Sequence, residues 1–162
     1  MTGTTRALAR FAANSTYEKL PAAIRHEGVR AFVNWVGCAA GASKEDAIER
    51  ALAVLTEFNG ANSSTVIGRG ERLDALNATF INSMSSAALA YNDTHFTTVA
   101  HPTSPVGAVL CALAERQPLS GKQLVNALVL GNEVQCRIGN ILCTPPAENA
   151  IGLSMAGLVG CI

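Results

Sequence analysis

The chain has 162 residues, with 12 basic and 12 acidic side chains and no formal net charge. That length provides one domain, or one part of a larger domain. Hydrophobic residues make up 49% of the chain, which excludes an intrinsically disordered protein. The balanced charge argues against nucleic-acid binding, because no basic surface is available to displace the counterions of the phosphates.

Helical periodicity dominates the beginning of the chain. A short helix is expected over Thr4–Ala13. A second helix is expected from Pro21, a residue suited to a first helical turn, to near Gly41. Its apolar side chains recur at steps of three and four residues and form one stripe.

The next segments alternate between helical and extended patterns. Ser43 and Asp46 resemble a capping box at the start of a third helix, whose apolar stripe runs to Phe58. Ser64–Gly68 is the one convincing extended segment, and it is too short and solitary to predict a sheet. A fourth helix, rich in small residues, is expected over Leu73–Tyr91.

A polar loop, Asn92–Thr103, separates this helix from two more. Ser104 is expected to cap the fifth helix and Pro105 to lie in its first turn. The sixth helix is expected from Ser120 to about Gly139. Its most apolar part is interrupted by asparagines and is far shorter than the roughly 20 residues of a membrane span.

The chain ends in an apolar segment. After a loop over Cys143–Asn149, another helix is expected over Ile151–Ile162, and no later residues cover its apolar side chains. Residues 1–162 are therefore expected to form the N-terminal part of a larger all-α domain, with at least five helices and no sheet of three or more strands. The N-terminus has no apolar signal core, so a cytoplasmic protein is predicted.

The polar loop contains the best candidates for chemistry. Asp93, Thr94, His95 and His101 combine a carboxylate, a hydroxyl and two imidazoles, which suits general acid–base catalysis. Protonated histidine also suits an anionic substrate. The alternative is a solvated loop in which Asp93 and Thr103 only cap and turn the backbone.

A metal site is a weaker hypothesis. Asp93, His95 and His101 are three potential ligands, but their D-x-H-x5-H spacing matches no closed structural zinc pattern. No functional metal is therefore predicted. The cysteines are odd in number, lack a C-x-x-C pair and are expected to be free buried thiols: Cys38, Cys111, Cys136, Cys143 and Cys161.

Three other features have structural interpretations. Gly68-Arg69-Gly70 lacks the third glycine of a phosphate-binding loop, and a turn is expected there. Glu133 and Arg137 are one helical turn apart and are expected to form an ion pair. Cys111 has no basic neighbour in the sequence, so it is not expected to act as a nucleophile.

Several segments occur in an order that resembles the MmgE/PrpD family. They are Thr65–Gly68, Asn82 before an Ala-rich helix, Asp93–His95, His101-Pro102, Leu113–Arg116, Leu119–Gly121, and Ala127–Gly139. The opening agrees as well, with a helix before Leu20-Pro21 and a helix that ends in Gly37–Gly41. With it, the resemblance covers essentially the whole chain.

The family includes 2-methylcitrate dehydratase, cis-aconitate decarboxylase and iminodisuccinate epimerase. The resemblance implies a metal-independent enzyme without a cofactor, usually a homodimer, with a large helical domain and a smaller lid domain. The lid is expected to lie outside residues 1–162. The implied chemistry is that of a lyase acting on a small polycarboxylate through a carbanion beside a carboxylate. Asp93 and His101 would be catalytic, and Thr94 and His95 would bind the substrate.

The chain departs from the family pattern at several positions. The acidic D-[FY]-D-D-T run of the family reads Ala90-Tyr91-Asn92-Asp93-Thr94 here. In a later G-[WF]-H-x-T-G turn, Ser154 and Ala156 stand in place of the histidine and the threonine. Two alternatives therefore remain open: a catalytically degenerate fragment that acts only as a helical dimerisation module, or an isomerase or epimerase on the same scaffold.

A geometric expectation completes the site. Pro102 disfavours helical backbone at the preceding residue, so His101 should project from the loop. The N-terminus of the following helix should attract a substrate carboxylate beside His101. Asp93 is expected to orient an imidazole and Thr94 to donate a hydrogen bond to the substrate. All four residues are expected to converge on one cleft.

Overall fold

Helices form most of residues 3–142, which are the residues that the computed structural model describes. In chain order the elements are α1 (Thr4–Asn14), the 3-10 helix η1 (Tyr17–Lys19), α2 (Ala22–Gly41), α3 (Asp46–Glu57), β1 (Ser64–Thr65), β2 (Arg72–Leu73), α4 (Ala75–Ala88), α5 (Thr103–Ala114) and α6 (Gly121–Leu142). The predicted all-α class is confirmed over these residues, where the one sheet has two strands. The expected loop Cys143–Asn149 and helix Ile151–Ile162 lie outside them.

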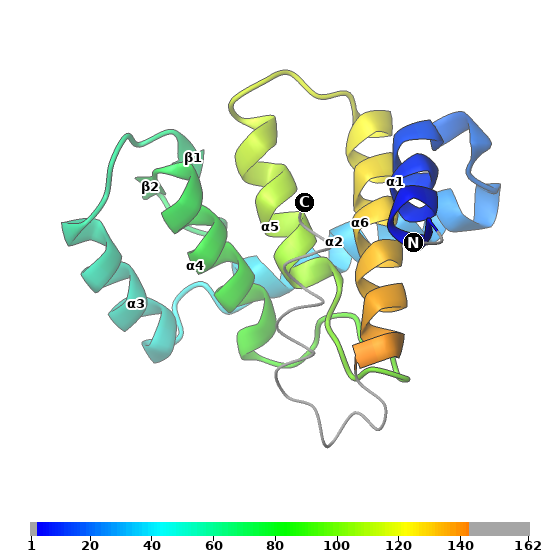
Figure 1. Cartoon of the computed structure of the whole chain (residues 1–162). Helices are drawn as coiled ribbons and strands as arrows, with labels where there is room; N and C mark the ends of the chain where they lie inside the picture. Colours follow the sequence, from blue (N-terminus) through cyan, green and yellow to red (C-terminus); the bar gives the residue numbers. More distant parts are fainter. Residues whose placement is uncertain (1–2, 143–162) are drawn as a thin grey trace.

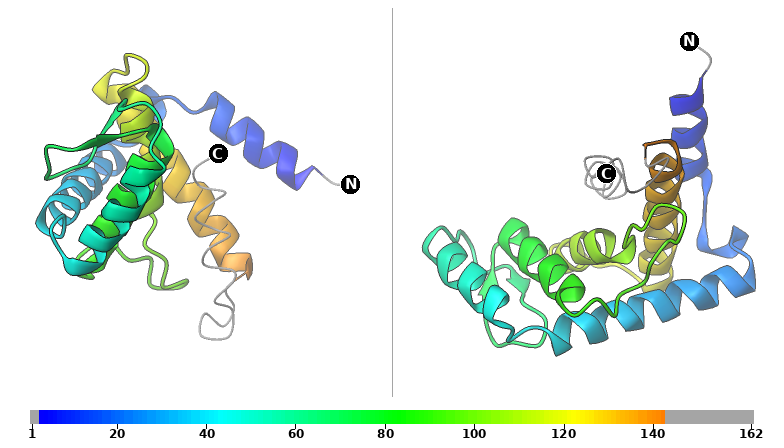
Figure 2. Two further views of the ribbon diagram at one scale, coloured as in Figure 1. Left: turned by 90° about the vertical axis from the view of Figure 1, so that its left-hand side faces the viewer. Right: turned by 90° about the horizontal axis from the view of Figure 1, so that it is seen from below.

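The helices α3, α4, α5 and α6 follow one another in a row, and α2 runs across this row on one side (Figure 1). Helix α2 contacts α4, α5 and α6. Trp35 of α2 is fully buried and packs against Gly107 of α5. Helix α1 projects beside α6, away from the row, and none of its residues is buried (Figure 2).

Ser43 does not cap α3, so the predicted capping box is wrong. Its hydroxyl donates to the Ala40 carbonyl at 2.8 Å, within the turn that ends α2. Glu45 occupies the N-cap position of α3 and makes no side-chain cap bond. The Ser43 hydroxyl is therefore used in the turn after α2 and not at the N-terminus of α3.

The extended segment at Ser64 is not solitary. β1 and β2 pair antiparallel, with Ser64 opposite Leu73 and Thr65 opposite Arg72. The second strand is only two residues long, too short for a periodic pattern to predict. Helix α4 then begins at Ala75, where Asp74 accepts hydrogen bonds from the N–H groups of Leu76 and Asn77, both at 3.0 Å.

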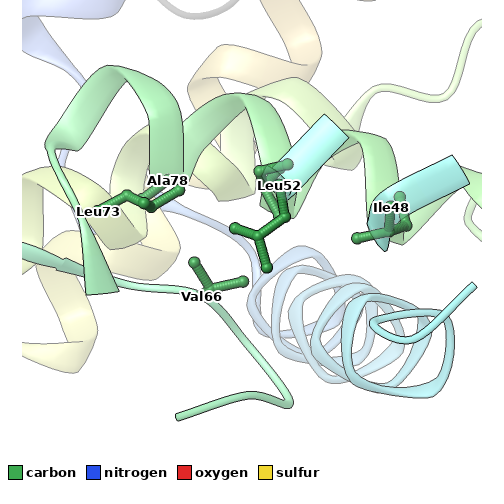
Figure 3. Close-up of a cluster of buried hydrophobic side chains, with 6 residues drawn as sticks. Ile48, Leu52, Val66, Leu73 and Ala78 are labelled. Atoms are coloured by element: carbon green, nitrogen blue, oxygen red, sulfur yellow. The ribbon is translucent and has the colours of Figure 1, made fainter. Parts of the chain in front are cut away.

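A cluster of buried apolar side chains joins the hairpin to α3 and α4 (Figure 3). Burying an aliphatic side chain of this size stabilises the fold by about 1.5–3 kcal/mol. The cluster consists of Ile48, Leu52, Val66, Leu73, Ala78 and Ile81. It fixes the hairpin on one end of the row.

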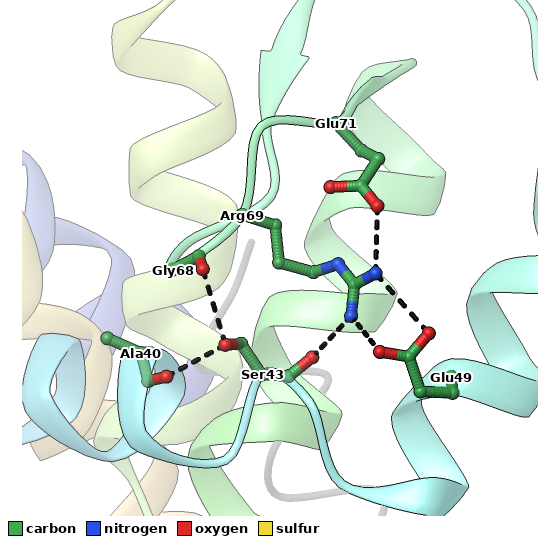
Figure 4. Close-up of polar contacts among 6 residues, drawn as sticks. All are labelled: Ala40, Ser43, Glu49, Gly68, Arg69 and Glu71. Atoms are coloured by element: carbon green, nitrogen blue, oxygen red, sulfur yellow. Dashed lines mark hydrogen bonds and ion pairs between the residues drawn. The ribbon is translucent and has the colours of Figure 1, made fainter.

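The segment Gly68–Gly70 is a turn, as expected, and Arg69 ties it to α3 (Figure 4). The guanidinium donates to the Ser43 carbonyl at 2.8 Å and pairs with Glu49 and Glu71. These hydrogen bonds to two carboxylates raise the pKa of Arg69 further above its usual range. Its cation is therefore committed to structure and is not available to a phosphate.

Two further observations agree with the sequence. Glu133 and Arg137 form the expected ion pair on α6, with 2.7 Å between Oε1 and Nε. No helix within residues 3–142 is both long enough and apolar enough to cross a membrane.

Candidate active site

The candidate residues lie on the loop between α4 and α5, which is held against α2 and α5 (Figure 1). Asn34 of α2 donates to the Tyr91 carbonyl at 3.1 Å. The buried Asn92 donates to the hydroxyl of Ser104 at 2.8 Å. These two amides fix the first half of the loop to two helices that belong to the body of the fold.

The loop contains strained backbone at both ends. Ala90 has a φ of 56° and Val99 a φ of 55°, and they are the two non-glycine residues with positive φ in the described part of the chain. Left-handed backbone costs a residue with a side chain roughly 1–2 kcal/mol, and a branched side chain is rare there. Such strain is typical of functional loops, whose conformation is imposed by their surroundings.

His101 stands at the end of this loop, two residues before α5. Its Nδ1 lies 3.0 Å from the Asp93 carbonyl oxygen and 3.2 Å from Oγ1 of Thr94. A carbonyl oxygen only accepts, so the bond to Asp93 requires a hydrogen on Nδ1. In the neutral ring Nε2 then carries the free lone pair, and no described residue forms a hydrogen bond with it.

The Asp93 side chain points to α5 instead of the imidazole. Its Oδ2 accepts from the Thr103 hydroxyl at 2.7 Å and from the Thr103 N–H at 3.3 Å. Burial raises the pKa of Asp93 above its usual range, and the two bonds from Thr103 oppose this rise only in part. Asp93 therefore contacts the His101 imidazole through its backbone carbonyl, while its carboxylate bonds to Thr103.

The N-terminus of α5 also differs from expectation. The helix begins at Thr103, and Ser104 is its second residue instead of its cap. The Asp93 carboxylate already accepts from the first N–H group, where the positive end of the helix dipole favours an anion. The chain's own carboxylate therefore fills the position that the sequence suggested for a substrate carboxylate.

His95 belongs to a neighbouring turn. Its Nδ1 lies 2.9 Å from the Thr98 hydroxyl, and its N–H donates to the Ala100 carbonyl at 2.9 Å. Thr98 is fully buried against Gly139 of α6, where an added Cβ would lie 3.0 Å from the threonine methyl. The structure thus brings Asp93, Thr94 and His101 into direct contact, while His95 bonds to Thr98 instead.

Comparison with known proteins identifies the same lineage as the sequence motifs. The sequence model of the MmgE/PrpD N-terminal domain matches residues 6–161. The chain belongs to the MmgE/PrpD family. A search of the curated proteins gave no significant match.

Two residues that contact the candidate site were missed as site residues by sequence reasoning. Thr103 is fully buried and links Asp93 to α6, because Asn132 of α6 donates to its hydroxyl at 2.8 Å. The available signal was the position of Asn132, a polar residue within the most apolar run of the sequence. In the sequence alone, Asn132 is only an interruption of that run.

The three thiols that the structure describes have raised pKa values, which disfavours the nucleophilic thiolate. Burial, with a smaller contribution from the Asp93 charge, raises the pKa of Cys38. Burial likewise raises the pKa of Cys136 to about 11, with Glu133 and Asp93 adding to it. Cys111 also has a pKa raised to about 11 by burial, which agrees with its expected inertness.

Within residues 3–142, no three histidine, cysteine, aspartate or glutamate side chains gather as a metal site would require. The absence of a metal from the reaction stays a prediction. A groove of about 710 Å³ lies among α1, α5 and α6 and is lined by apolar or small side chains, such as Leu8, Leu110 and Leu130. None of the four candidate residues lines it, so the expected cleft also stays a prediction.

Proposed function

We propose that the chain is the N-terminal part of a lyase that acts on a small polycarboxylate, with His101 as its general acid–base residue. The observation that carries the proposal is the contact between His101 Nδ1 and the Asp93 carbonyl, 3.0 Å long. This contact leaves Nε2 as the proton-accepting nitrogen of a neutral imidazole. Histidine suits this task because it titrates close to neutral pH.

The chemistry requires one proton transfer at carbon. Nε2 accepts a proton from the carbon beside a substrate carboxylate, and the resulting imidazolium keeps its Nδ1–H bond to Asp93. In dehydration the hydroxide on the neighbouring carbon leaves as the double bond forms, and the imidazolium gives its proton to that hydroxide to release water. In decarboxylation the ring starts as the imidazolium, carbon dioxide leaves, and Nε2–H protonates the carbanion. In epimerisation the ring removes a proton from carbon and returns one. In the proposed complex the Thr94 hydroxyl, 3.2 Å from Nδ1, helps to keep the His101 ring in place. A protonated His95 would contribute positive charge toward a substrate carboxylate.

Family membership supports this chemistry in general terms, and the reaction type and substrate are proposals. In line with the family, we propose a cytoplasmic enzyme that needs neither metal nor cofactor. Dehydration of a 2-methylcitrate-like substrate and decarboxylation of a cis-aconitate-like substrate are the leading candidates. Epimerisation on the same scaffold is the alternative if proton transfer persists without assistance to a leaving group.

The test uses the complete enzyme, with whatever polypeptide supplies the lid. Turnover is measured on 2-methylcitrate, cis-aconitate and iminodisuccinate. The His101→Ala variant should lose about 10²–10⁴ in turnover, the usual contribution of a general acid or base. His26→Ala is the matched control, because His26 is exposed on α2. Turnover that is equal in the two variants contradicts the assignment of His101.

A second candidate function is favoured by the environment of Asn92. Where the family has an acidic residue, Asn92 is buried and its amide donates a hydrogen bond to the Ser104 hydroxyl. A catalytically degenerate helical module is the corresponding proposal. Absence of turnover on all three substrates in the complete assembly, together with an intact fold, would support it.

Both candidate functions include a homodimer. Its basis is the low share of charged residues, 15%, together with large apolar side chains that are exposed. Their exposed fractions are 65% for Val33, 55% for Phe80 and 83% for Leu76. We expect sedimentation velocity to show a dimer at micromolar concentration. A monomer whose sedimentation coefficient does not change with concentration would contradict the proposal.

A further inference from the structure

A single buried hydroxyl connects α6 to the backbone that holds His101. Asn132 Nδ2 donates to Thr103 Oγ1 at 2.8 Å, and Thr103 Oγ1 donates to Asp93 Oδ2 at 2.7 Å. The direction of both bonds is fixed, because the threonine hydroxyl has one hydrogen and receives the amide hydrogen on its lone pair. Thr103 has no exposed surface, so neither bond competes with bulk water.

This chain of bonds ends at the residue that selects the tautomer of His101. Asp93 is held through its side chain by Thr103, and its carbonyl oxygen receives the hydrogen of Nδ1 at 3.0 Å. A histidine tautomer is set by the hydrogen bond that one ring nitrogen makes, and the other nitrogen is then left for chemistry. A shift of the Asp93 backbone would release Nδ1.

We propose that Thr103 and Asn132 are positioning residues that fix His101 as the Nδ1–H tautomer, with Nε2 directed to proton transfer. The catalytic use of Nε2 rests on the proposed function above. The tautomer itself does not, because it follows from the contacts of His101 with Asp93.

A purely structural cap would explain part of the cluster. The Thr103 N–H needs an acceptor, and Asp93 Oδ2 provides one. The bond from Asn132 lies outside this cap, because the amide comes from α6 and ends on the Thr103 hydroxyl instead of on a free N–H group of α5. This favours positioning over capping.

The experiment reads the tautomer by NMR. Long-range ¹⁵N–¹H spectra of the ring nitrogens are recorded on the 162-residue chain at a pH where the imidazoles are neutral. The three histidines are assigned with His26→Gln and His95→Gln. We expect Nδ1–H for His101 in the unmodified chain. We expect a shift of the population toward Nε2–H, the form that a free imidazole prefers, in Thr103→Val and in Asn132→Leu.

Matched controls separate positioning from general destabilisation. Asn126→Leu removes a half-buried asparagine from the same helix, where it donates to the Ser15 carbonyl. Thr56→Val removes a hydroxyl that bonds within α3. Both controls should leave the His101 signals unchanged. Thr103→Ser keeps the hydroxyl and should restore the Nδ1–H form.

Three results would overturn the proposal. One is an Nε2–H tautomer in the unmodified chain. Another is an unchanged Nδ1–H tautomer in both folded variants. The third is loss of the fold, seen by circular dichroism, in Thr103→Val and Asn132→Leu together, which would make the cluster a structural cap.

The complete enzyme gives a second measurement. Thr103→Val should lower kcat by about 10–100-fold, the usual cost of losing a residue that orients a catalytic group, and should change KM little. Thr103→Ser should recover most of kcat. If His101→Ala retains full turnover, the proposed function fails, while the NMR result still decides whether Thr103 and Asn132 position the imidazole.

Discussion

Two regions of the molecule use buried or half-buried asparagines in different ways. At the hairpin, Asn82 of α4 donates to the Thr65 carbonyl and accepts from the Ile67 N–H, both at 2.9 Å. At the site loop, Asn92 and Asn132 each form one side-chain bond and leave their carbonyl oxygen without a described partner. Asn82 therefore satisfies two backbone groups of the hairpin, whereas Asn92 and Asn132 each bond to one hydroxyl. Buried side-chain atoms without a described partner occur in both regions, since Ser64 Oγ and Arg69 Nε of the hairpin are also among them.

The backbone shows the same contrast. The hairpin turn needs one positive φ, and Gly68 supplies it at 78°. The site loop needs two, and it uses Ala90 and Val99, which have side chains. A sequence optimised for stability alone would place glycine or asparagine at such positions. The difference indicates that the hairpin region is built for structure and that the loop has been selected under another constraint.

The largest effect that we expect concerns the hairpin turn. In Gly68→Ala the new Cβ would lie 2.7 Å from Ser43 Oγ and 2.9 Å from Ala40 Cα. Backbone strain and the clash together should lower the free energy of unfolding by about 2–5 kcal/mol. Gly70→Ala is the control from the same turn, because no atom would lie within 4 Å of its Cβ. Equal unfolding midpoints for the two variants in urea would contradict the contrast.

The next prediction compares the two asparagines directly. Asn82→Leu leaves two part-buried backbone groups without a partner and should cost about 2–4 kcal/mol. Asn132→Leu removes one side-chain bond and should cost only about 0.5–1.5 kcal/mol. Urea unfolding of both variants provides the measurement. A larger loss in Asn132→Leu would show that the site cluster, and not the hairpin, is the more important for stability.

The helical part of this contrast was predictable from the sequence. Apolar side chains at helical spacing and the residues Pro21 and Gly121 located α2 and α6 to within a residue or two at their N-termini. Such features act locally, so a single sequence contains them. Of the hairpin, the sequence predicted only the strand at Ser64. The second strand, β2, is stabilised by long-range contacts of Leu73 with the core and has no pattern of its own.

The sequence predicted which loop residues form the candidate site, but not which hydrogen bonds join them. The loop residues Asp93, Thr94 and His101 do meet, and family resemblance supplied their expected roles. The sequence could not show that the Asp93 carboxylate bonds to Thr103. Asp93 has two kinds of acceptor, its carboxylate and its backbone carbonyl, and tertiary packing decides which of them meets Thr103 and which meets His101. The link to Asn132 spans 29 residues and depends on where α6 crosses the loop.

A smaller effect is expected at the strained end of the loop. Val99→Gly relieves left-handed strain of about 1–2 kcal/mol and adds about 0.5–1 kcal/mol of backbone entropy cost, so the variant should gain up to about 1.5 kcal/mol. Thr97→Gly, in the same loop without positive φ, should lose stability instead. Thermal unfolding of the two variants tests the sign. A loss of stability in Val99→Gly would mean that the contacts of the valine outweigh its strain.

The smallest effect concerns two carboxylates whose pKa values move in opposite directions. At the hairpin, burial would raise the pKa of Glu115, but bonds from Thr65 and Arg72 outweigh it and the pKa is lowered. At the loop, burial dominates and the pKa of Asp93 is raised. The structural region therefore stabilises the ionised form of its carboxylate, and the site stabilises the protonated form.

The signs follow from linkage. Glu115 contributes stability that is present above its unfolded pKa, about 4.3, and that is lost as the pH falls through its lower folded value. Asp93 binds its proton more tightly when folded, so its contribution becomes less favourable as the pH rises from about 3.9 through its raised folded value. We therefore expect the stability difference between the unmodified chain and Glu115→Gln to increase as the pH rises toward about 4.3, the unfolded value. The difference from Asp93→Asn should decrease as the pH rises above about 3.9. Each change should be on the order of 1 kcal/mol or less, because both groups are partly solvated. Urea unfolding of the three proteins across this pH range gives the two stability differences as functions of pH. If both differences change with pH in the same direction, the carboxylates of the hairpin and the loop do not differ as proposed.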